Sequence, residues 1–296
     1  VRMSTERLKG WIFELDASLK NQLSIAATKI RMAAIEGTFH AKSGHPGGSL
    51  SIADTLAYLY CVHLRIDPQN PPWDERDRLV LSKGHTAPAL YGALALRGYF
   101  DFEEIKTLRK VNSRLQGHPD MKGTPGVDMT TGSLGQGVSA ATGMALAAKI
   151  DGSDRRVYAI LGDGELEEGQ VWEAAMFAAH KKLDNLCVVV DNNNLQIDGT
   201  LDEVNSPHPI PEKFTAFGFH VIMIDGHDFE QIESAFEAAR NNKDKPTAII
   251  QTSVKGKGVS FMENQVGWHG SAPNKEQYEQ AMKELSELKV HYEEAE

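Results

Sequence analysis

The stretch AILGDGELEEGQVW, from Ala159 to Trp172, passes abruptly from apolar residues to glycine and acidic residues. A second stretch, VVVDNNNLQIDG from Val188 to Gly199, passes in the same way into amides, acids and glycine. Short runs rich in β-branched residues that end at such turn signals are typical of strands buried within a parallel sheet. We therefore expect one strand to end near Asp163 and another near Asn193.

Similar apolar runs alternate with helical patterns along the rest of the chain. With these two included, five strands are predicted, in RLVLSKGH (78–85, a short strand and a tight turn), RVYAILGD (156–163), NLCVVVDN (185–192), FHVIMIDG (219–226) and PTAIIQTS (246–253). Helices are predicted in 23–41, in 51–64, in 136–150, along a stripe of Trp172, Ala175, Met176 and Ala179, and after a capping-box-like start at Asp228 and Gln231.

The alternation predicts an α/β fold, in which helices flank both faces of a parallel sheet. We expect an N-terminal helical extension over 1–40 and an acidic C-terminal helix over 274–296, and we see no linker, so 1–296 is predicted to form one domain. The apolar stripe expected for the C-terminal helix consists of Tyr278, Ala281, Leu285 and Leu288. The Gly- and Pro-rich stretch 117–137 is predicted to be a long loop, and such loops inside a compact domain are usually functional or disordered.

Composition excludes several classes of protein. The net charge of −10 argues against nucleic acid or an anionic membrane as the main partner. No apolar run approaches the roughly 18 residues of a membrane helix, and the first residues lack the core of a signal peptide. Cys61 and Cys187 lie among apolar residues, as buried thiols do, so we expect a reducing, cytoplasmic setting.

The two expected strand ends suggest a metal and diphosphate site. Ligands of open parallel sheets bind beyond the carboxyl ends of the strands, where Asp163 and Asn193 are expected. Carboxylate and amide oxygens suit Mg²⁺, and the helix expected after Gly164 would direct its N-terminus at a diphosphate. Alone, G-D-G or N-N is more often a simple turn. The joint pattern is stronger, because 27 residues separate the G-D-G of 162–164 from Asn192.

This spacing resembles the thiamine-diphosphate signature, and the chain as a whole resembles the N-terminal, diphosphate-binding half of transketolase. The similarity extends from about Ile25 to Pro273. The matching segments, in the family's order, are KSGHPGGSLS, DRLVLSKGHT, GHPD, PGVDMTTGSLGQG, GDGELEEGQVWEA, DNNNLQIDG and GWHGSAP.

The resemblance implies a ligand set for Mg²⁺, with Ca²⁺ or Mn²⁺ as substitutes. Asp163 and Asn193 would supply side-chain oxygens and Leu195 its backbone carbonyl, while Asn192 replaces an acidic residue that is frequent in the family. The resemblance also implies that thiamine diphosphate is bound by Gly132, Leu134, Gly164, Glu168, Ile197, His85 and His269, together with Asp163 and Asn193. For Leu134 and Ile197, ordinary core packing is the alternative interpretation.

Four histidines in Gly-His or Trp-His turns match family positions that converge on the reacting centre, although each alone would more often be a surface or packed residue. His85 and His269 are expected near the diphosphate, and His45 and His269 near the substrate aldehyde or hydroxyl. His118 would bind the C1 hydroxyl or carbonyl of the donor. Imidazole suits these roles because it donates or accepts a proton near neutral pH.

Glu168 and Glu173 have two interpretations. Both could be first-turn carboxylates that favour a helix N-terminus. In transketolases, carboxylates at the matching positions lie in an acidic relay between two active sites at the subunit interface. Glu168 also differs from the usual pattern of deoxyxylulose-phosphate synthases.

In the family, the glutamate that activates the aminopyrimidine lies in a separate pyrimidine-binding domain, which this sequence does not contain. The resemblance therefore implies one subunit of a split transketolase, with the C-terminal subunit on another chain in an α₂β₂ assembly. The reaction would transfer a two-carbon ketol unit from a ketose phosphate to an aldose.

Three other functions stay open. One is the α subunit of a 2-oxoacid dehydrogenase E1, which shares G-D-G but not the set of Gly-His turns. Another is a truncated or regulatory cofactor-binding domain without turnover, although diphosphate binding alone does not need His45 or His118. A third changes only the substrate, to a branched or sulfonated sugar.

Overall fold

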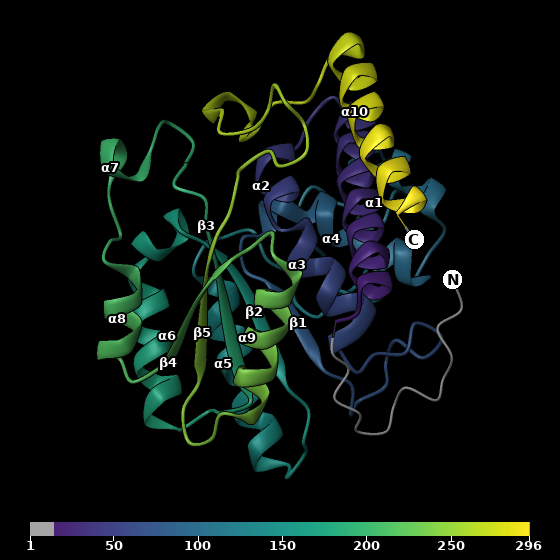
Figure 1. Ribbon diagram of the computed structural model, residues 1–296. Coiled ribbons are helices and arrows are strands. Elements are labelled where there is room, and N and C mark those ends of the chain that lie inside the picture. Colours follow the sequence, from purple (N-terminus) through teal and green to yellow (C-terminus); the bar gives the residue numbers. More distant parts are fainter. Residues whose placement is uncertain (1–14, 296) are drawn as a thin grey trace.

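A computed structural model describes residues 15–295, so residues 1–14 of the predicted N-terminal extension lie outside the described part. The central feature is a five-stranded sheet in the order β1-β2-β3-β5-β4, in which every paired strand is parallel (Figure 1). The predicted α/β class is confirmed, as are all five predicted strands. The strands are β1 (Arg78–Leu81), β2 (Val157–Gly162), β3 (Leu186–Asn192), β4 (His220–Asp225) and β5 (Thr247–Thr252).

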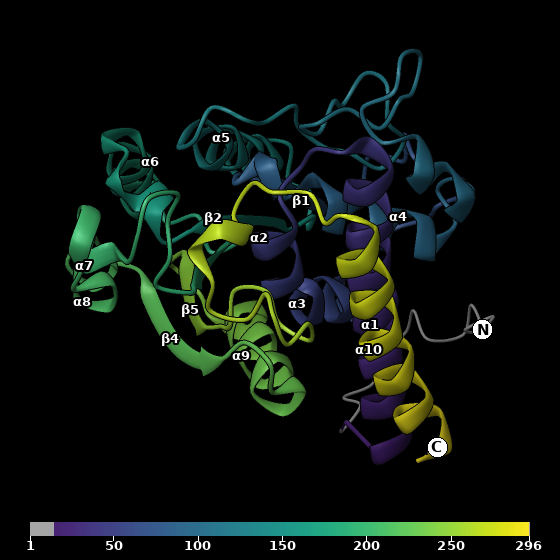
Figure 2. The ribbon, with the colours of Figure 1, turned by 90° about the horizontal axis from the view of Figure 1, so that it is seen from above.

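Helices cover both faces of the sheet (Figures 1 and 2). Alternate side chains of β2 point to opposite faces: Tyr158 and Ile160 enter one buried cluster, and Ala159 and Leu161 enter another. The first cluster lies under α1 (Ala17–Ala41), α3 (Ala53–Tyr58), α4 (Ala87–Arg97) and α9 (Phe229–Asn241). The second lies under α5 (Gln136–Ile150), α6 (Gly169–His180) and α8 (Ile210–Ala216). Remaining helical elements are α2 (Pro46–Ser51), η2 (Leu59–His63), η3 (Gly84–Thr86), η4 (Phe102–Thr107), η5 (Gly164–Glu167), α7 (Leu201–Val204), η6 (Val266–Trp268) and α10 (Lys275–Glu294).

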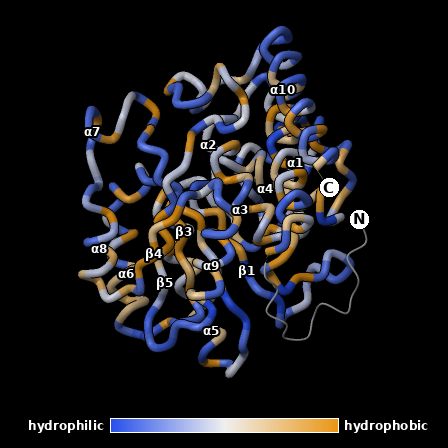
Figure 3. Tube along the Cα trace, in the orientation of Figure 1, coloured by the Kyte–Doolittle hydropathy of each residue, from blue (hydrophilic) through white to orange (hydrophobic). Residues whose placement is uncertain are grey.

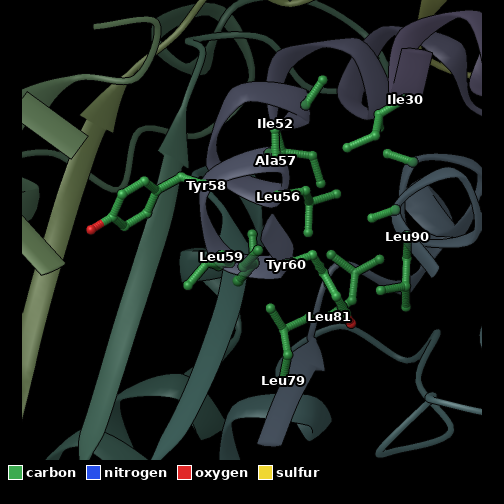
Figure 4. Close-up of a cluster of buried hydrophobic side chains, with 14 of the residues drawn as sticks. Ile30, Ile52, Leu56, Ala57, Tyr58, Leu59, Tyr60, Leu79, Leu81 and Leu90 are labelled. Carbon is green, nitrogen blue, oxygen red and sulfur yellow. The ribbon is translucent and has the colours of Figure 1, made fainter. Parts of the chain in front are cut away.

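Burial on both faces explains why the strands are apolar throughout. Figure 3 shows hydrophobic residues concentrated along the central strands, whereas much of α10 is hydrophilic. Figure 4 shows Ile30, Leu56 and Leu90, from three different helices, gathered beside Leu79 and Leu81 of β1. Continuous burial of this kind is typical of parallel sheets with helices on both faces.

The C-terminal helix packs beside α1, as both views show (Figures 1 and 2). A capping box starts α10: Asn274 accepts from the Gln277 backbone N–H, and Gln277 accepts from the Asn274 N–H. Ala281 and Leu285 of the predicted stripe are fully buried. No helix within residues 15–295 is both long and apolar enough to cross a membrane.

Two predicted helices differ in detail from the structure. The stripe predicted for α6 is wrong at Met176, which is 61% exposed, because the buried face consists of Val171, Ala174, Ala175 and Ala178. So many small apolar residues in one helix allow more than one stripe. The predicted helix 51–64 breaks at Ile52 and ends in the π-helical turn η2.

The long loop 117–137 is irregular, as predicted, but it is tied to β1. The Asp128 carboxylate accepts from the Leu79 N–H at 2.7 Å, and the Thr131 hydroxyl donates to the Leu81 carbonyl at 2.7 Å. These bonds satisfy backbone groups on the free side of β1, which pairs only with β2. The loop therefore behaves as an extension of the sheet edge and is held close to the strand ends.

Candidate functional site

The loops after β2 and β3 meet at Asp163. Its side chain is only 2% exposed and accepts from the backbone N–H groups of Gly164 at 2.9 Å and Asn194 at 2.6 Å. Burial and the nearby charge of Asp191 raise the pKa of Asp163 to about 6. A bound cation would offset this cost of keeping a buried carboxylate charged.

Asn193 and Leu195 lie on the loop that Asp163 contacts. Asn193 Nδ2 donates to Asp191 Oδ2 at 2.8 Å, and Asn193 Oδ1 accepts from the Leu195 N–H at 3.1 Å. The Oδ1 atom of Asn192 is buried without a hydrogen-bond partner. Within residues 15–295 no cluster of three or more His, Cys, Asp or Glu side chains could hold a metal. A metal here would therefore depend on amide and carbonyl oxygens beside Asp163.

Two buried lysines at the same edge were missed by the sequence reasoning. Lys83, after β1, donates to Asp191 Oδ2 at 2.5 Å and to the Gly48 carbonyl at 3.2 Å. Lys255, after β5, donates to the Leu195 carbonyl at 2.7 Å and contacts His269 Nδ1 at 2.9 Å. The sequence did contain a signal that could have identified both lysines. Each precedes a glycine just after a predicted strand, in SKGH and VKGKG.

These lysines bring two buried ammonium groups to the edge where the sequence suggests an anion. Burial favours the neutral form of Asp191, but the Lys83 ammonium overcomes this and lowers the pKa of Asp191 to about 2. Burial lowers the pKa of Lys255 to about 8, partly opposed by Asp163. Because the cost of burying an ammonium falls when an anion lies beside it, a diphosphate here would favour the charged form of Lys255.

The four predicted histidines lie together. The ring of His45 is 5.2 Å from that of His85, 5.5 Å from that of His269 and 6.4 Å from that of His118, between centroids. The rings of His85 and His269 stack at 5.1 Å. Residues separated by more than 200 positions in sequence are thus brought into one cluster beside Lys255.

The histidines are neutral at pH 7. Burial, then Arg109, lowers the pKa of His45 to about 4, while burial, then Lys255, lowers that of His269 to about 3. The pKa of His85 is also lowered, mainly by burial. The Nδ1 atom of His45 is buried without a partner. A neutral imidazole can accept a proton and, once protonated, return it, as general acid–base catalysis requires.

Of the predicted cofactor-lining residues, Gly132 lies beside this cluster. Gly132 has φ 150°, and a Cβ there would lie 3.0 Å from His118 Cδ2, so its backbone closely approaches that imidazole. Ile197 is 66% exposed, which rules out the core-packing alternative for it. Leu134 is half-buried and belongs to none of the buried clusters. Gly164 directly follows Asp163 and is the first residue of η5.

Glu168 and Glu173 are exposed, and Glu168 precedes α6 without a side-chain capping bond. The buried carboxylate of this segment is instead Glu165, which is 2% exposed. It accepts from the Ser82 hydroxyl and, at 2.8 Å, from the Gly135 N–H. Glu165 therefore joins the ends of β1 and β2 to the long loop, whereas the sequence analysis singled out only Glu168 and Glu173 in this segment.

A parallel sheet with metal-compatible oxygens, buried lysines and glycine turns at its carboxyl edge defines a ligand-binding domain of the α/β class. The family model "Transketolase, thiamine diphosphate binding domain" matches residues 22–290. The chain belongs to this family.

Relatives agree with this assignment. The 6-deoxy-6-sulfo-D-fructose transketolase subunit SqwG of Clostridium sp. (strain MSTE9) is 50% identical over 259 residues, covering 88% of this chain and 94% of that protein. An apulose-4-phosphate transketolase subunit of Phocaeicola vulgatus is 42% identical over 265 residues, covering 90% of this chain and 94% of that protein. Human transketolase is 42% identical over 267 residues, which cover 89% of this chain but only 42% of the human protein.

Solved structures match in the same way. The crystal structure of transketolase from Campylobacter jejuni superposes with a TM-score of 0.84 at 35% identity, covering 93% of this chain and 46% of that one. The family and fold expected from the sequence are confirmed.

Proposed function

We propose that this chain is the diphosphate-binding subunit of a split transketolase, which transfers a two-carbon ketol unit from a ketose phosphate to an aldose. The observation that carries the proposal is the meeting of Asp163, the Asn193 loop and the four histidines at one sheet edge. The relatives support the split, because two proteins named as transketolase subunits are covered over 94% of their length.

The residues at the edge fit thiamine diphosphate and a hard cation. Asp163, Asn193 and the Leu195 carbonyl would hold Mg²⁺, or Ca²⁺ or Mn²⁺ in its place, through oxygen atoms alone. Gly164, His85, Lys83 and Lys255 would bind the diphosphate. When bound, the cofactor supplies the nucleophilic carbon that carries the two-carbon unit. Its rings would lie against Gly132, Leu134 and Ile197, with Glu168 on the side that faces the partner chain.

The histidines would then handle the substrate. His118 binds the C1 hydroxyl or carbonyl of the donor and so orients its carbonyl carbon. His45 and His269, both neutral at pH 7, would take the proton from the reacting hydroxyl and, once protonated, return it to the aldehyde oxygen.

We further propose that 1–296 forms one domain in the cytoplasm, where its cysteines remain reduced; both Cys61 and Cys187 are free thiols. The pyrimidine-binding domain, with its activating glutamate, would come from a C-terminal subunit in an α₂β₂ assembly. Met176 and Phe177 are exposed on α6, the helix that Glu168 precedes, which is consistent with a partner that covers this helix.

The substrate has two candidates. A common donor such as xylulose 5-phosphate fits the family, whereas the 50% identical relative is named for a sulfonated fructose and another for apulose 4-phosphate. That identity favours a specialised branched or sulfonated sugar as the second candidate. The transketolase family match favours ketol transfer over the 2-oxoacid dehydrogenase alternative.

The test is a ketol-transfer assay with thiamine diphosphate and Mg²⁺, run on the chain alone and with the product of an adjacent gene. Donors would be xylulose 5-phosphate, 6-deoxy-6-sulfofructose and apulose 4-phosphate, each with several aldose acceptors. We expect turnover only with the partner. Full activity of the chain alone would contradict the split, carbon dioxide release from a 2-oxoacid would favour the dehydrogenase, and inactivity with every donor would favour a non-catalytic domain.

A further inference from the structure

Arg109 lies beside the histidine cluster, and neither the sequence motifs nor the proposed mechanism assigns it a role. Its guanidinium packs on the backbone of Gly117, the residue before His118. A Cβ atom at Gly117 would stand 2.6 Å from Arg109 Cζ and 2.8 Å from its Nε, so only glycine leaves room for the guanidinium. Burial is the largest cause that lowers the pKa of His45 and of His118, and the charge of Arg109 is the next largest for both. Arg109 is therefore close to both histidines.

The backbone around Arg109 is built to hold this position. Arg109 has φ 60°, a left-handed conformation that is uncommon for a residue with a side chain. Its N–H donates to the Leu115 carbonyl at 2.8 Å and closes the loop between them. The buried Tyr91 hydroxyl donates to the carbonyls of Gln116 and His118, at 2.8 and 3.2 Å. Arg109 and His118 thus lie on one segment whose backbone is anchored.

Arg109 makes no hydrogen bond or ion pair through its side chain within residues 15–295. Arg114 on the same loop differs, because its Nε donates to Glu104 Oε2 at 2.8 Å and its Nη2 donates to Oε1. The chain carries a net charge of −10, so carboxylates to pair with are abundant. An arginine left unpaired beside a reacting centre is suited to bind an anion with its planar fork of N–H groups.

The side chains become more exposed from Asp163, at the carboxyl edge of the sheet, towards Arg109. Asp163 and Lys255 are each 2% exposed, His45 is half-buried, and His118 and Arg109 are exposed. A sugar whose reacting carbons lie beside His45 and His118 would therefore direct its far end outwards, past Arg109. In a phosphorylated or sulfonated sugar that far end is an anion.

We propose that Arg109 binds the anionic end group of the sugar substrate, a phosphate or a sulfonate, and so positions the substrate against His45 and His118. This inference rests on the proposed ketol transfer. It assigns to this chain a part of substrate recognition that the family resemblance places mostly on the partner subunit.

The kinetic test compares charged and neutral donors in the complex with the partner subunit. Arg109→Gln should raise the KM for xylulose 5-phosphate at least tenfold, with kcat and the kinetics of neutral erythrulose changed less than twofold. Arg109→Lys should recover part of the loss. Arg114→Gln, on the same loop, is the matched control and should change neither donor. An equal loss with both donors, or no change with xylulose 5-phosphate, would overturn the proposal.

A binding test separates this proposal from the proposed function. The His118 resonance of the ¹⁵N-histidine-labelled full chain, in complex with the partner, is followed during titration with xylulose 5-phosphate, 6-deoxy-6-sulfofructose or unmodified xylulose. We expect the His118 resonance to shift only with the sugars that carry an anionic group, and the two titrations show which anion binds more tightly. The shift should be lost in Arg109→Gln and kept in Arg114→Gln. A shift that persists in Arg109→Gln, or that xylulose produces equally, overturns the role of Arg109 whether or not turnover occurs. An anion-dependent shift without turnover would instead contradict ketol transfer and leave the Arg109 site in place.

Discussion

The ammonium group of Lys255 lies 2.7 Å from the carbonyl oxygen of Leu195, the backbone atom that we propose as a metal ligand. Lys255 also contacts His269, so one side chain links the proposed metal site to the histidine cluster. It reaches this place from the end of β5, which neighbours β3 in the sheet.

Replacement of Lys255 tests whether this cation serves the diphosphate. We expect Lys255→Met to weaken the binding of thiamine diphosphate with Mg²⁺ by about tenfold or more, roughly 1.4 kcal/mol, because a buried positive charge is lost from the site. Isothermal titration calorimetry measures the Kd. Lys257→Met removes a charge two residues away and should leave the Kd unchanged. An unaltered Kd in Lys255→Met would contradict the role.

Asp163 is expected to couple metal binding to stability. Thiamine diphosphate with Mg²⁺ should raise the unfolding temperature of the wild-type chain, since a ligand that binds only the folded state stabilises it. In Asp163→Ala this increase should vanish, because the proposed metal site loses the one carboxylate in its proposed ligand set. Differential scanning fluorimetry, with and without Mg²⁺, measures the effect. Asp198→Ala, on the exposed part of the next loop, should retain the increase, and an equal loss in both variants would argue against a specific ligand.

The half-buried His45 should make the chain less stable in acid. Its pKa of about 4 in the folded state lies below the value of about 6.5 expected when it is unfolded. Between these pH values the unfolded chain binds more protons, so the free energy of unfolding decreases as the pH falls from about 6.5 to about 4. We expect His45→Gln to flatten this decrease in urea unfolding curves, and the exposed His180→Gln to leave it as it is. Identical slopes in all three proteins would show that His45 does not titrate as described.

Two glycines should respond to alanine in opposite ways. Gly132→Ala is expected to lower the free energy of unfolding by about 1–3 kcal/mol, because φ is 150° and the new Cβ meets His118. Gly143→Ala lies within α5 with nothing within 4 Å of the new Cβ, so it should stabilise the chain by about 0.5–1 kcal/mol. Chemical denaturation measures both. A neutral Gly132→Ala would mean that the loop can change its backbone without cost.

The sequence predicts the strands well because burial on both faces requires continuous apolar runs. It predicts the buried face of α6 poorly, since the run of alanines leaves the choice between Val171 and Met176 to tertiary packing. Asp163 and Asn193, at the carboxyl edge of the sheet, could be predicted from the sequence because polar residues interrupt the apolar runs at a defined spacing. Their roles as metal ligands stay predictions.

Contacts between distant segments could not be predicted from periodicity. Nothing in the local pattern says that Lys83 meets Asp191 or that Glu165 bridges Ser82 and Gly135, because each pair depends on which strands become neighbours. The four histidines could be grouped only through the family resemblance. Arg109 could not be identified even through the resemblance, because its position depends on its own left-handed backbone conformation and on a glycine eight residues later.

The strand register has a consequence for cooperativity. Gly162 pairs with Asp191, and Asn192 pairs with Thr252, so the candidate ligands follow directly from three hydrogen-bonded strands. A ligand can bind there only when these three strands are correctly aligned, so its binding stabilises that arrangement of the protein. Amide hydrogen exchange in β2, β3 and β5 should therefore slow as one unit upon binding, including at positions far from the ligand, because opening any of these strands dismantles the same site.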